Sequence, residues 1–271
     1  MSRASFRCRS ASASRPGSAP AASTLPDDAA RPDPRADNPG GADAEPGRRR
    51  GRRAARPRNA AALILWRDTP AGPEMLMGRR HAKSRFMPNV LVFPGGAVDR
   101  ADHYAKPLTP LPEATRIALE RKATPSLARA IAVAAVRELY EETGLVLGER
   151  QGAGLAPDLA CIGYLCRAVT PAASPIRFNA RFLLAPAERV QGDIAGSDEL
   201  DGIGWYTRDA AHADALAPIT ALVMKEFLGW HCLVPSARVS HPMALFQGLD
   251  GKTVEHSSVG AQAAARPVTS R

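Results

Sequence analysis

Several features that would identify a class of protein are missing from this sequence of 271 residues. No run of 18 or more apolar residues occurs, so the sequence predicts no transmembrane helix. The four cysteines, Cys8, Cys161, Cys166 and Cys232, form no Cys-x-x-Cys pair, which argues against a zinc site and a disulfide framework. A reduced, intracellular setting therefore fits best.

Lysine is absent from residues 1–57, which hold 12 Arg against 6 Asp plus Glu and so carry +6 of the net charge of +9. The remainder holds 24 Lys plus Arg against 21 Asp plus Glu, a net charge of only +3. Most of the excess positive charge therefore lies in residues 1–57. The rest of the chain gives no compositional reason to expect a nucleic-acid partner.

Residues 1–57 are rich in Ala, Arg, Pro, Ser and Gly, with Phe6 as the single aromatic residue. Such a segment buries too little apolar area to offset its ordering entropy, so we predict a disordered extension. The first 26 residues contain Arg and Ser but no acid, which is also typical of an organellar transit peptide. A start codon assigned too early is the third interpretation. We expect a cytoplasmic protein, or a mitochondrial one if the extension is a transit peptide.

The ordered part is predicted to span residues 58–257, with a flexible tail over 258–271. Apolar runs bounded by turn residues predict strands over 60–66, 74–79, 90–93, 159–170, 176–185, 199–206, 243–247 and 252–256. Periodic apolar positions and end signals predict helices over 113–121, 126–143 and 219–230. Because the elements mix without regular alternation, we predict an α+β fold with a mixed β-sheet.

The helix over 126–143 ends in a cluster of acids, before Gly144 in a C-cap position. Glu138, Glu141 and Glu142 have i, i+3, i+4 spacing and so share one helix face. Each like-charge pair costs about 0.2–0.5 kcal/mol, and Arg137 can offset part of this by pairing with Glu141. A divalent cation would offset the rest, because Mg²⁺ and Mn²⁺ prefer clustered carboxylate oxygens. The alternative is a solvated acidic face.

These acids are part of a longer motif. The stretch RELYEETGL matches the core of the Nudix box position by position, and an FPGG element lies upstream. The chain therefore resembles the Nudix hydrolases. The resemblance rests on Gly95, Gly96, Gly144 and the Arg-Glu-x-x-Glu-Glu stretch 137–142.

The resemblance implies a Nudix-type α/β/α sandwich and a pyrophosphohydrolase that uses Mg²⁺ or Mn²⁺. Such enzymes cleave a nucleoside diphosphate linked to another moiety, so the expected partner is a small-molecule nucleotide. If the roles of the matching family residues apply here, Glu141 and Glu142 bind metal, and Glu138 is a ligand or the base that activates water. Arg137 then holds the glutamates by hydrogen bonds. The two glycines, Gly95 and Gly96, let the backbone approach the metal site. Nudix relatives are often dimers, so a homodimer is also expected.

The chain departs from the usual box in one respect. The first box glycine usually lies about 14 residues before the arginine, but Gly96 lies 41 residues before Arg137, so about 27 residues are inserted, which we assign to about 100–123. The glutamate expected six positions after the glycine is Asp102 here. An insertion at this point resembles the branch related to peroxisomal coenzyme A diphosphatases.

A second feature indicates the same branch. Coenzyme A–cleaving Nudix enzymes carry two arginines five residues apart before FPGG, and Arg80 and Arg85 have this spacing. His81 stands where Ser or Thr is usual, and Asn89 replaces a glycine. Coenzyme A or an acyl-CoA is therefore the leading substrate, with Arg80 and Arg85 on its phosphates.

Glu199 resembles the acid that precedes a Trp-containing strand in many Nudix proteins, where it can be an extra ligand or base. One rival is a non-catalytic Nudix-fold regulator that binds nucleotides, which the missing box glutamate would explain. The other is an RNA-directed, cap-removing enzyme that uses the Arg-rich segment.

Overall fold

The computed structural model describes residues 55–84, 86–152, 154–248 and 251–255. The described residues belong to the unit Arg52–Arg271. The extension predicted over residues 1–57 lies outside them except for 55–57, and so does the tail over 258–271. Both remain predictions.

The described part begins with an antiparallel hairpin of β1 (Arg58–Thr69) and β2 (Gly72–Arg80). In the middle of β1 the consecutive residues Leu63, Ile64 and Leu65 are fully buried. Successive side chains of a strand point to opposite faces of its sheet, so both faces are covered at this strand.

One mixed sheet organises the domain. Nine strands of the described residues belong to it, in the order β11-β10-β7-β8-β1-β2-β3, with β4 paired to β1 and β9 paired to β2. The pairs β1/β8 and β7/β10 are parallel and the others antiparallel. The predicted α+β class with a mixed sheet is confirmed. The remaining strands are β3 (Leu91–Val92), β4 (Gly95–Ala97), β7 (Gly163–Val169), β8 (Phe178–Pro186), β9 (Leu200–Tyr206), β10 (Met243–Gln247) and β11 (Gly251–Glu255).

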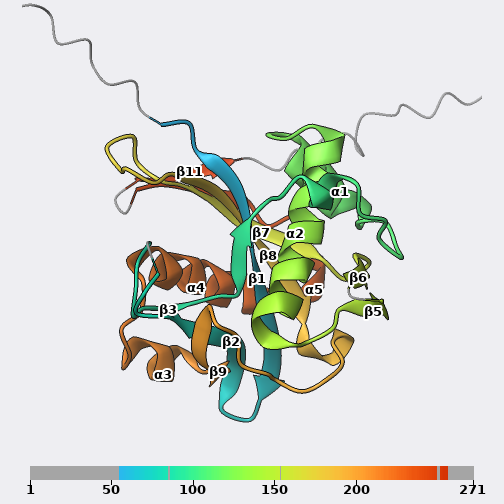
Figure 1. Cartoon of the computed structure of the whole chain (residues 1–271). Helices are drawn as coiled ribbons and strands as arrows, with labels where there is room; N and C mark the ends of the chain where they lie inside the picture. The colour runs from blue at the N-terminus through green and yellow to red at the C-terminus, as the bar shows by residue number, and fades with distance from the viewer. Residues whose placement is uncertain (1–54, 85, 153, 249–250, 256–271) are drawn as a thin grey trace, which may run out of the picture. The chain divides into compact units, whose positions relative to one another are not determined.

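Helices cover both faces of the sheet, with α2 and α4 on opposite sides of β1 (Figure 1). One core joins α1 (Glu113–Glu120) and α2 (Pro125–Thr143) to Leu63 and Leu65, and the other joins α3 (Arg208–His212) and α4 (Pro218–His231) to Ile64. This is the expected α/β/α layering. None of the helices in the described ranges has the length and apolarity that a membrane span needs.

The ends of α2 follow the signals in its sequence. The hydroxyl of Thr124 accepts a hydrogen bond from the Leu127 N–H at 3.3 Å, and Pro125 occupies the first turn. At the other end, Gly144 has φ 75 and its N–H donates to Tyr140 O, as in an αL cap. The helix therefore stops directly after the acidic cluster.

The inserted segment leaves and returns beside α2. A 3₁₀ turn at Ala101–His103 is fixed to the helix, since His103 Nδ1 lies 3.1 Å from Ser126 Oγ and Arg129 donates to the His103 carbonyl. The insertion then forms α1, where Thr115 Oγ1 donates to Ile162 O at 2.8 Å. The insertion is thus an addition packed on α2, and it does not separate the glycine element from the helix in space.

Some predicted boundaries were wrong. We expected the chain to leave the sheet at Pro94, but Gly95–Ala97 forms β4 by pairing with β1. The strand predicted from residue 159 begins only at Gly163. The sequence reading also missed α3, a short α5 (Pro235–Arg238), and a separate hairpin of β5 (Gly148–Gln151) and β6 (Gly154–Pro157).

Candidate active site

The C-terminal part of α2 lies against β4, and this contact places two carboxylates beside glycine backbone. The N–H of Gly95 donates to Glu142 Oε2 at 2.8 Å. A Cβ added to Gly96 would lie 2.5 Å from Glu138 Oε1, and one added to Gly95 would lie 2.5 Å from Ala61 O. Neighbouring atoms leave no room for a Cβ atom at either position, so both positions require glycine.

Arg137 connects the acids to one another. Its Nη1 donates to Glu138 Oε1 and to Glu141 Oε2, both at 2.8 Å. Its Nε and Nη2 donate to the two oxygens of Asp102 at 2.9 and 3.1 Å, and Nη2 also donates to Ala97 O at 3.1 Å. The fork-shaped guanidinium is suited to such paired contacts. Asp102, six residues after Gly96, is thus the acid that pairs with both sides of the Arg137 fork.

The three glutamates differ in exposure. Glu142 is 3% exposed and Glu138 9%, whereas the side chain of Glu141 is 53% exposed. Burial raises the pKa of Glu142 to about 8, against the opposing hydrogen bond from Gly95. Burial also raises the pKa of Glu138, and Arg137 only partly offsets this. The negative charge of this pair is therefore incompletely balanced by the described residues.

Two further predicted residues lie near the pair. Arg80 is close enough to lower the pKa of Glu142, and Glu199 is close enough to raise the pKa of both Glu138 and Glu142. Arg80 pairs with Leu200, so β2 and β9 bring these two side chains together. The structure thus gathers Arg80, Glu138, Glu142 and Glu199, with Glu141 on the exposed side of Arg137.

The segment before β3 contains the other predicted substrate residue, Arg85, which lies outside the described residues. Asn89 has φ 59, in the left-handed region where asparagine is the best tolerated residue after glycine. Its carbonyl accepts from Arg79 Nη1 at 2.9 Å. Asparagine can therefore serve at a position where the coenzyme A signature has glycine.

The residues present are compatible with a divalent metal ion. No three His, Cys, Asp or Glu side chains within the described ranges form a ready-made metal cage. Mg²⁺ is nevertheless usually held by one or two carboxylates, with waters and substrate phosphates as its other ligands. Glu138 and Glu142 each keep one oxygen to which no described residue donates a hydrogen bond. Two carboxylates of unbalanced charge suit this kind of ligation.

A cavity of about 620 Å³ adjoins this region. Gly95, Gly96, Arg80 and Glu199 line it at the carboxylate side. The rest of its lining is mainly apolar and comes from the α4-facing side of the sheet, from residues 86–93 and from the start of α4. The cavity is of the size and character of small-molecule sites.

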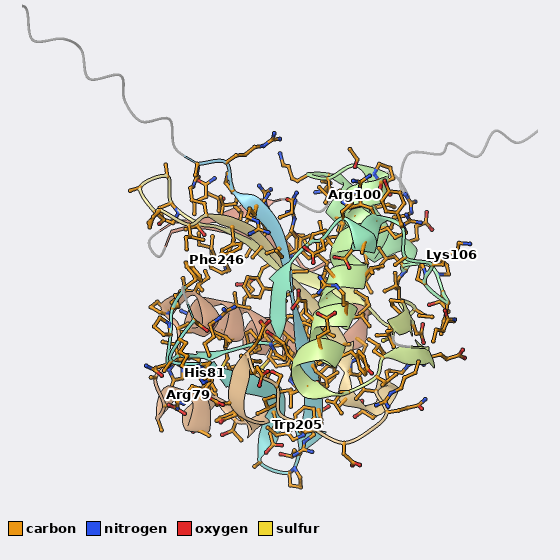
Figure 2. The ribbon with its side chains drawn as sticks, viewed as in Figure 1. Arg79, His81, Arg100, Lys106, Trp205 and Phe246 are labelled. Atoms are coloured by element: carbon orange, nitrogen blue, oxygen red, sulfur yellow. The ribbon has the colours of Figure 1, made fainter. Side chains whose placement is uncertain are left out.

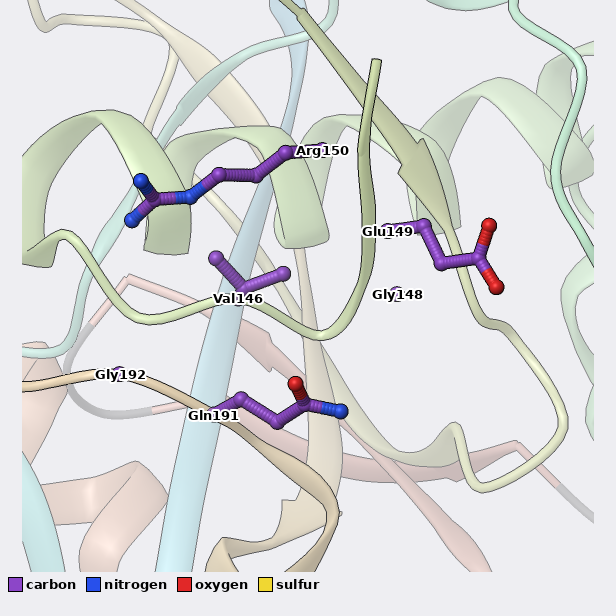
Figure 3. A pocket seen from close by; sticks show the side chains of 6 residues that line it. All are labelled: Val146, Gly148, Glu149, Arg150, Gln191 and Gly192. Carbon is purple, nitrogen blue, oxygen red and sulfur yellow. The ribbon is translucent and has the colours of Figure 1, made fainter.

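A second cavity, of about 550 Å³, lies between the β5–β6 hairpin and the Gln191–Gly192 segment (Figure 3). Arg150 extends from the hairpin so that its guanidinium lies 5.5 Å from the centre of the Tyr140 ring. This cavity shares no lining residue with the first, and its described lining contains one acid, Glu149. We assign it no role in the chemistry.

Sequence reasoning missed part of the site. The carbonyl of Ala97 as an acceptor for Arg137 has no signal in the sequence, because it depends on the pairing of β4 with β1. The apolar cavity was also missed, although Phe86 and Met87, which precede the FPGG element, line it.

Comparisons with known proteins bear on the family and the fold of this chain. No protein-family model matches the chain. The acyl-coenzyme A diphosphatase NUDT19 of Gallus gallus is 35% identical over 138 residues, which cover 38% of this chain and 36% of that protein. A Caenorhabditis elegans protein named as nudix hydrolase 7 is 38% identical over 95 residues, covering 35% of this chain and 24% of that protein. The chain thus matches about a third or less of the length of these relatives.

A solved structure extends the likeness to the fold. A Nudix hydrolase from Alicyclobacillus acidocaldarius superimposes with a TM-score of 0.52 at 25% sequence identity. The match covers 71% of this chain and 98% of that one. The similarity therefore includes nearly the whole of a Nudix domain.

Replacing Asp102 by alanine should leave the guanidinium of Arg137 without its bidentate partner. Because Asp102 is buried, we expect the free energy of unfolding to fall by about 3 kcal/mol in urea titrations. Asp193→Ala, at an exposed position, is the control and should stay within about 0.5 kcal/mol of the wild type. Equal stability of the two variants would contradict the role given to the ion pair.

Gly96→Ala should force the Glu138 carboxylate away from β4, because the new methyl group overlaps it. Overpacking of this kind costs about 1–3 kcal/mol, which thermal or urea unfolding can measure. Gly196→Ala adds the same methyl group where nothing lies within 4 Å, and we expect no loss there. A tolerated Gly96→Ala would show that Glu138 has room to move.

The raised pKa of Glu142 predicts a pH dependence of the metal-free protein. Between its ordinary pKa of 4.5 and the folded value of about 8, the folded state retains a proton that the unfolded state releases. The contribution of Glu142 to stability is therefore fully present below pH 4.5 and is lost as the pH rises through 8.

Glu142→Gln removes this titration. Measured in EDTA, the variant should gain roughly 5 kcal/mol relative to the wild type between pH 4.5 and pH 8. Glu149→Gln, on an exposed strand, should show no such gain. A pH-independent difference between wild type and Glu142→Gln would refute the buried, uncompensated state of this carboxyl.

Proposed function

Because this chain is similar to Nudix hydrolases in both sequence and fold, we infer that it hydrolyses the pyrophosphate bond of a nucleoside diphosphate linked to another moiety. The observation that carries the inference is the pair of buried carboxylates, Glu138 and Glu142, packed against Gly95 and Gly96 beside an apolar cavity. A pyrophosphate at this point would meet carboxylates, glycine backbone and Arg80 within one small region.

We propose that Glu138 and Glu142 hold Mg²⁺ or Mn²⁺, with the more exposed Glu141 as an outer ligand. When bound, such an ion neutralises phosphate oxygens and makes a coordinated water more acidic. Arg137 keeps Glu138 and Glu141 in position, since one nitrogen of its guanidinium donates to both, and the Gly95 N–H holds Glu142. Asp102 positions Arg137 in turn.

Glu138 is the proposed general base, with Glu199 as the alternative. A base works best when its pKa is close to the working pH, and burial moves the pKa of Glu138 in that direction. Glu199 is exposed and lines the cavity. Arg80, and Arg85 as the second predicted arginine, would bind the phosphates, because a guanidinium can donate two parallel hydrogen bonds to one phosphate group.

Coenzyme A or an acyl-CoA is the proposed substrate. The name of the Gallus gallus relative supports it, although that match covers 36% of the relative. The spacing of Arg80 and Arg85 and the left-handed backbone at Asn89 support it from within this chain. The products would be 3′,5′-ADP and a phosphopantetheine.

The missing box glutamate was the argument for the non-catalytic alternative, and the pairing of Asp102 with Arg137 supports the enzymatic proposal instead. No described residue gives specific support for an RNA substrate. Hydrolysis of small substrates by a variant that lacks residues 1–57 would test that alternative.

The test is a substrate panel with Mg²⁺ and with Mn²⁺: coenzyme A, acyl-CoAs, NADH, ADP-ribose, dinucleoside polyphosphates and capped RNA, each read by product identity. Glu141→Gln and Glu142→Gln should each lose about a hundredfold or more in kcat. Glu149→Gln is the matched control on an exposed strand and should retain activity.

Retained turnover in both glutamine variants would contradict the assignment of these carboxylates. If the wild type cleaves no nucleotide while Mn²⁺ still raises its melting temperature, the chain is a binding protein and the enzymatic proposal is wrong.

A further inference from the structure

The segment 86–90, directly before β3, connects the wall of the 620 Å³ cavity to Arg80. Its first two residues line the cavity, as Arg80 does. Near its other end, the Asn89 N–H donates to the Arg80 carbonyl at 3.0 Å, and the Arg80 N–H donates to Val90 O at 2.9 Å. The position of the 86–90 segment therefore determines where the backbone of the proposed phosphate-binding arginine lies.

The backbone of the 86–90 segment adopts unusual conformations. Met87 has φ 49 and Asn89 has φ 59, both in the left-handed region. Asparagine is tolerated there, but a long side chain such as that of methionine is uncommon. Such conformations persist where the surrounding contacts hold them. The Phe86 ring makes one such contact, since its centre lies 5.3 Å from that of Phe178.

Arg79 makes the contact at Asn89. Its Nη1 donates to the Asn89 carbonyl at 2.9 Å, and its Nη2 donates to Asp214 Oδ1. The same oxygen of Asp214 accepts from the Ala215 N–H at 2.6 Å. The planar guanidinium thus joins the segment to the connection between α3 and α4. Figure 2 shows Arg79 in the part of the molecule where α3 lies.

The connection that carries Asp214 is itself anchored to β3. The Leu91 N–H donates to Ala215 O at 2.8 Å, and the Ala217 N–H donates to Leu91 O at 3.3 Å. Arg79 therefore ties the Asn89 carbonyl to a point that the sheet holds in place.

Arg79 holds the segment from outside the cavity. Successive side chains of a strand point to opposite faces, so the side chains of Arg79 and Arg80 diverge from β2. Arg80 lines the cavity and lies near Glu142, whereas Arg79 is not among the described residues of the lining. Any effect of Arg79 on the reaction is therefore indirect.

The ion pair of Arg79 and Asp214 stays charged at neutral pH. The hydrogen bond from Arg79 holds the pKa of Asp214 below its ordinary value, and the same bond raises the pKa of Arg79. The two side chains are 34% and 26% exposed, and ion pairs this open to solvent contribute little to stability. The main consequence of the pair is therefore geometric, because it fixes the Asn89 carbonyl.

We propose that Arg79 is a positioning residue for nucleotide binding: with Asp214 it holds the 86–90 segment, and through that segment the backbone of Arg80, without touching the substrate. The inference rests on the proposed function, in which Arg80 binds the phosphates. It goes beyond that function, because it gives a task to an ion pair outside the cavity.

The experiment measures kcat and KM of the full chain for coenzyme A and ADP-ribose, which both contain a pyrophosphate. Arg79→Ala and Asp214→Ala should each raise KM about tenfold and change kcat less than about twofold, because binding is weakened and the chemical step is not. The double variant should be no worse than the single ones, since both residues act through one contact. Arg208→Ala breaks the exposed ion pair with Asp209 on α3 and is the control, which should keep the wild-type KM.

The sign of the change separates position from charge. Nucleotides are anionic, so a purely electrostatic effect would raise KM in Arg79→Ala and lower it in Asp214→Ala. A positional effect raises KM in both variants. Opposite changes, or KM values within about twofold of the wild type in both variants, would overturn the inference.

Conservative variants separate a lost contact from a lost fold. Asp214→Asn keeps an oxygen that accepts from Arg79, so its KM should lie closer to the wild type than that of Asp214→Ala. Arg79→Lys keeps the charge but has no planar fork for two acceptors, so its KM should stay raised. Melting temperatures show that each variant is folded. A wild-type KM in Arg79→Lys would contradict the need for the fork.

Amide exchange tests the inference without turnover. In EDTA, hydrogen exchange at the Arg80 and Asn89 amides should become about tenfold faster in both alanine variants, because their hydrogen bonds open more often. Faster exchange with a weaker Kd for ADP-ribose would support the positioning role even if the wild type hydrolyses nothing, and only the proposed function would then fail. Unchanged exchange at both amides would overturn the role of Arg79.

Discussion

The bidentate ion pair between Arg137 and Asp102 is the interaction on which the site depends. Acids at a helix C-terminus face the negative end of the helix dipole, and three of them repel one another. Arg137 offsets this repulsion by contacting Glu138 and Glu141 at once, but only while Asp102 and the Ala97 carbonyl hold its other nitrogens. The same residue thereby links α2, β4 and the start of the insertion.

The site combines this network of hydrogen bonds with two buried carboxylates. Glu138 and Glu142 are buried against glycine backbone, and their raised pKa values indicate an electrostatic cost that the described residues do not remove. Groups perturbed in this way are often functional. A divalent cation would relieve this cost, because its charge is opposite to that of the carboxylates. The mainly apolar cavity beside β4 adds a surface for the part of the substrate that carries no charge.

Local rules predicted much of this protein. The start and end of α2 followed from Thr124, Pro125 and Gly144, because caps are satisfied by neighbours in sequence. The first hairpin, the strands around residues 176–206 and the last hairpin followed from apolar runs and turn residues. The short strand β4 was not predicted, since glycines carry no strand signal and pair here only because β1 offers a free edge. The β5–β6 hairpin and α3 were missed for a similar reason, because apolar residues show no clear periodicity in such short segments.

The sequence by itself determined the identity and order of the chemical groups: the acids on one turn of helix, the arginine before them and the glycines upstream. Helix periodicity is sufficient to place such residues together. Only the tertiary structure decided that Asp102 reaches Arg137 across an insertion, and that Arg79, opposite Leu91 in the sheet, joins Asn89 to Asp214. The physical reason is strand register. It is set by pairing between distant segments, and no local pattern in the chain records it.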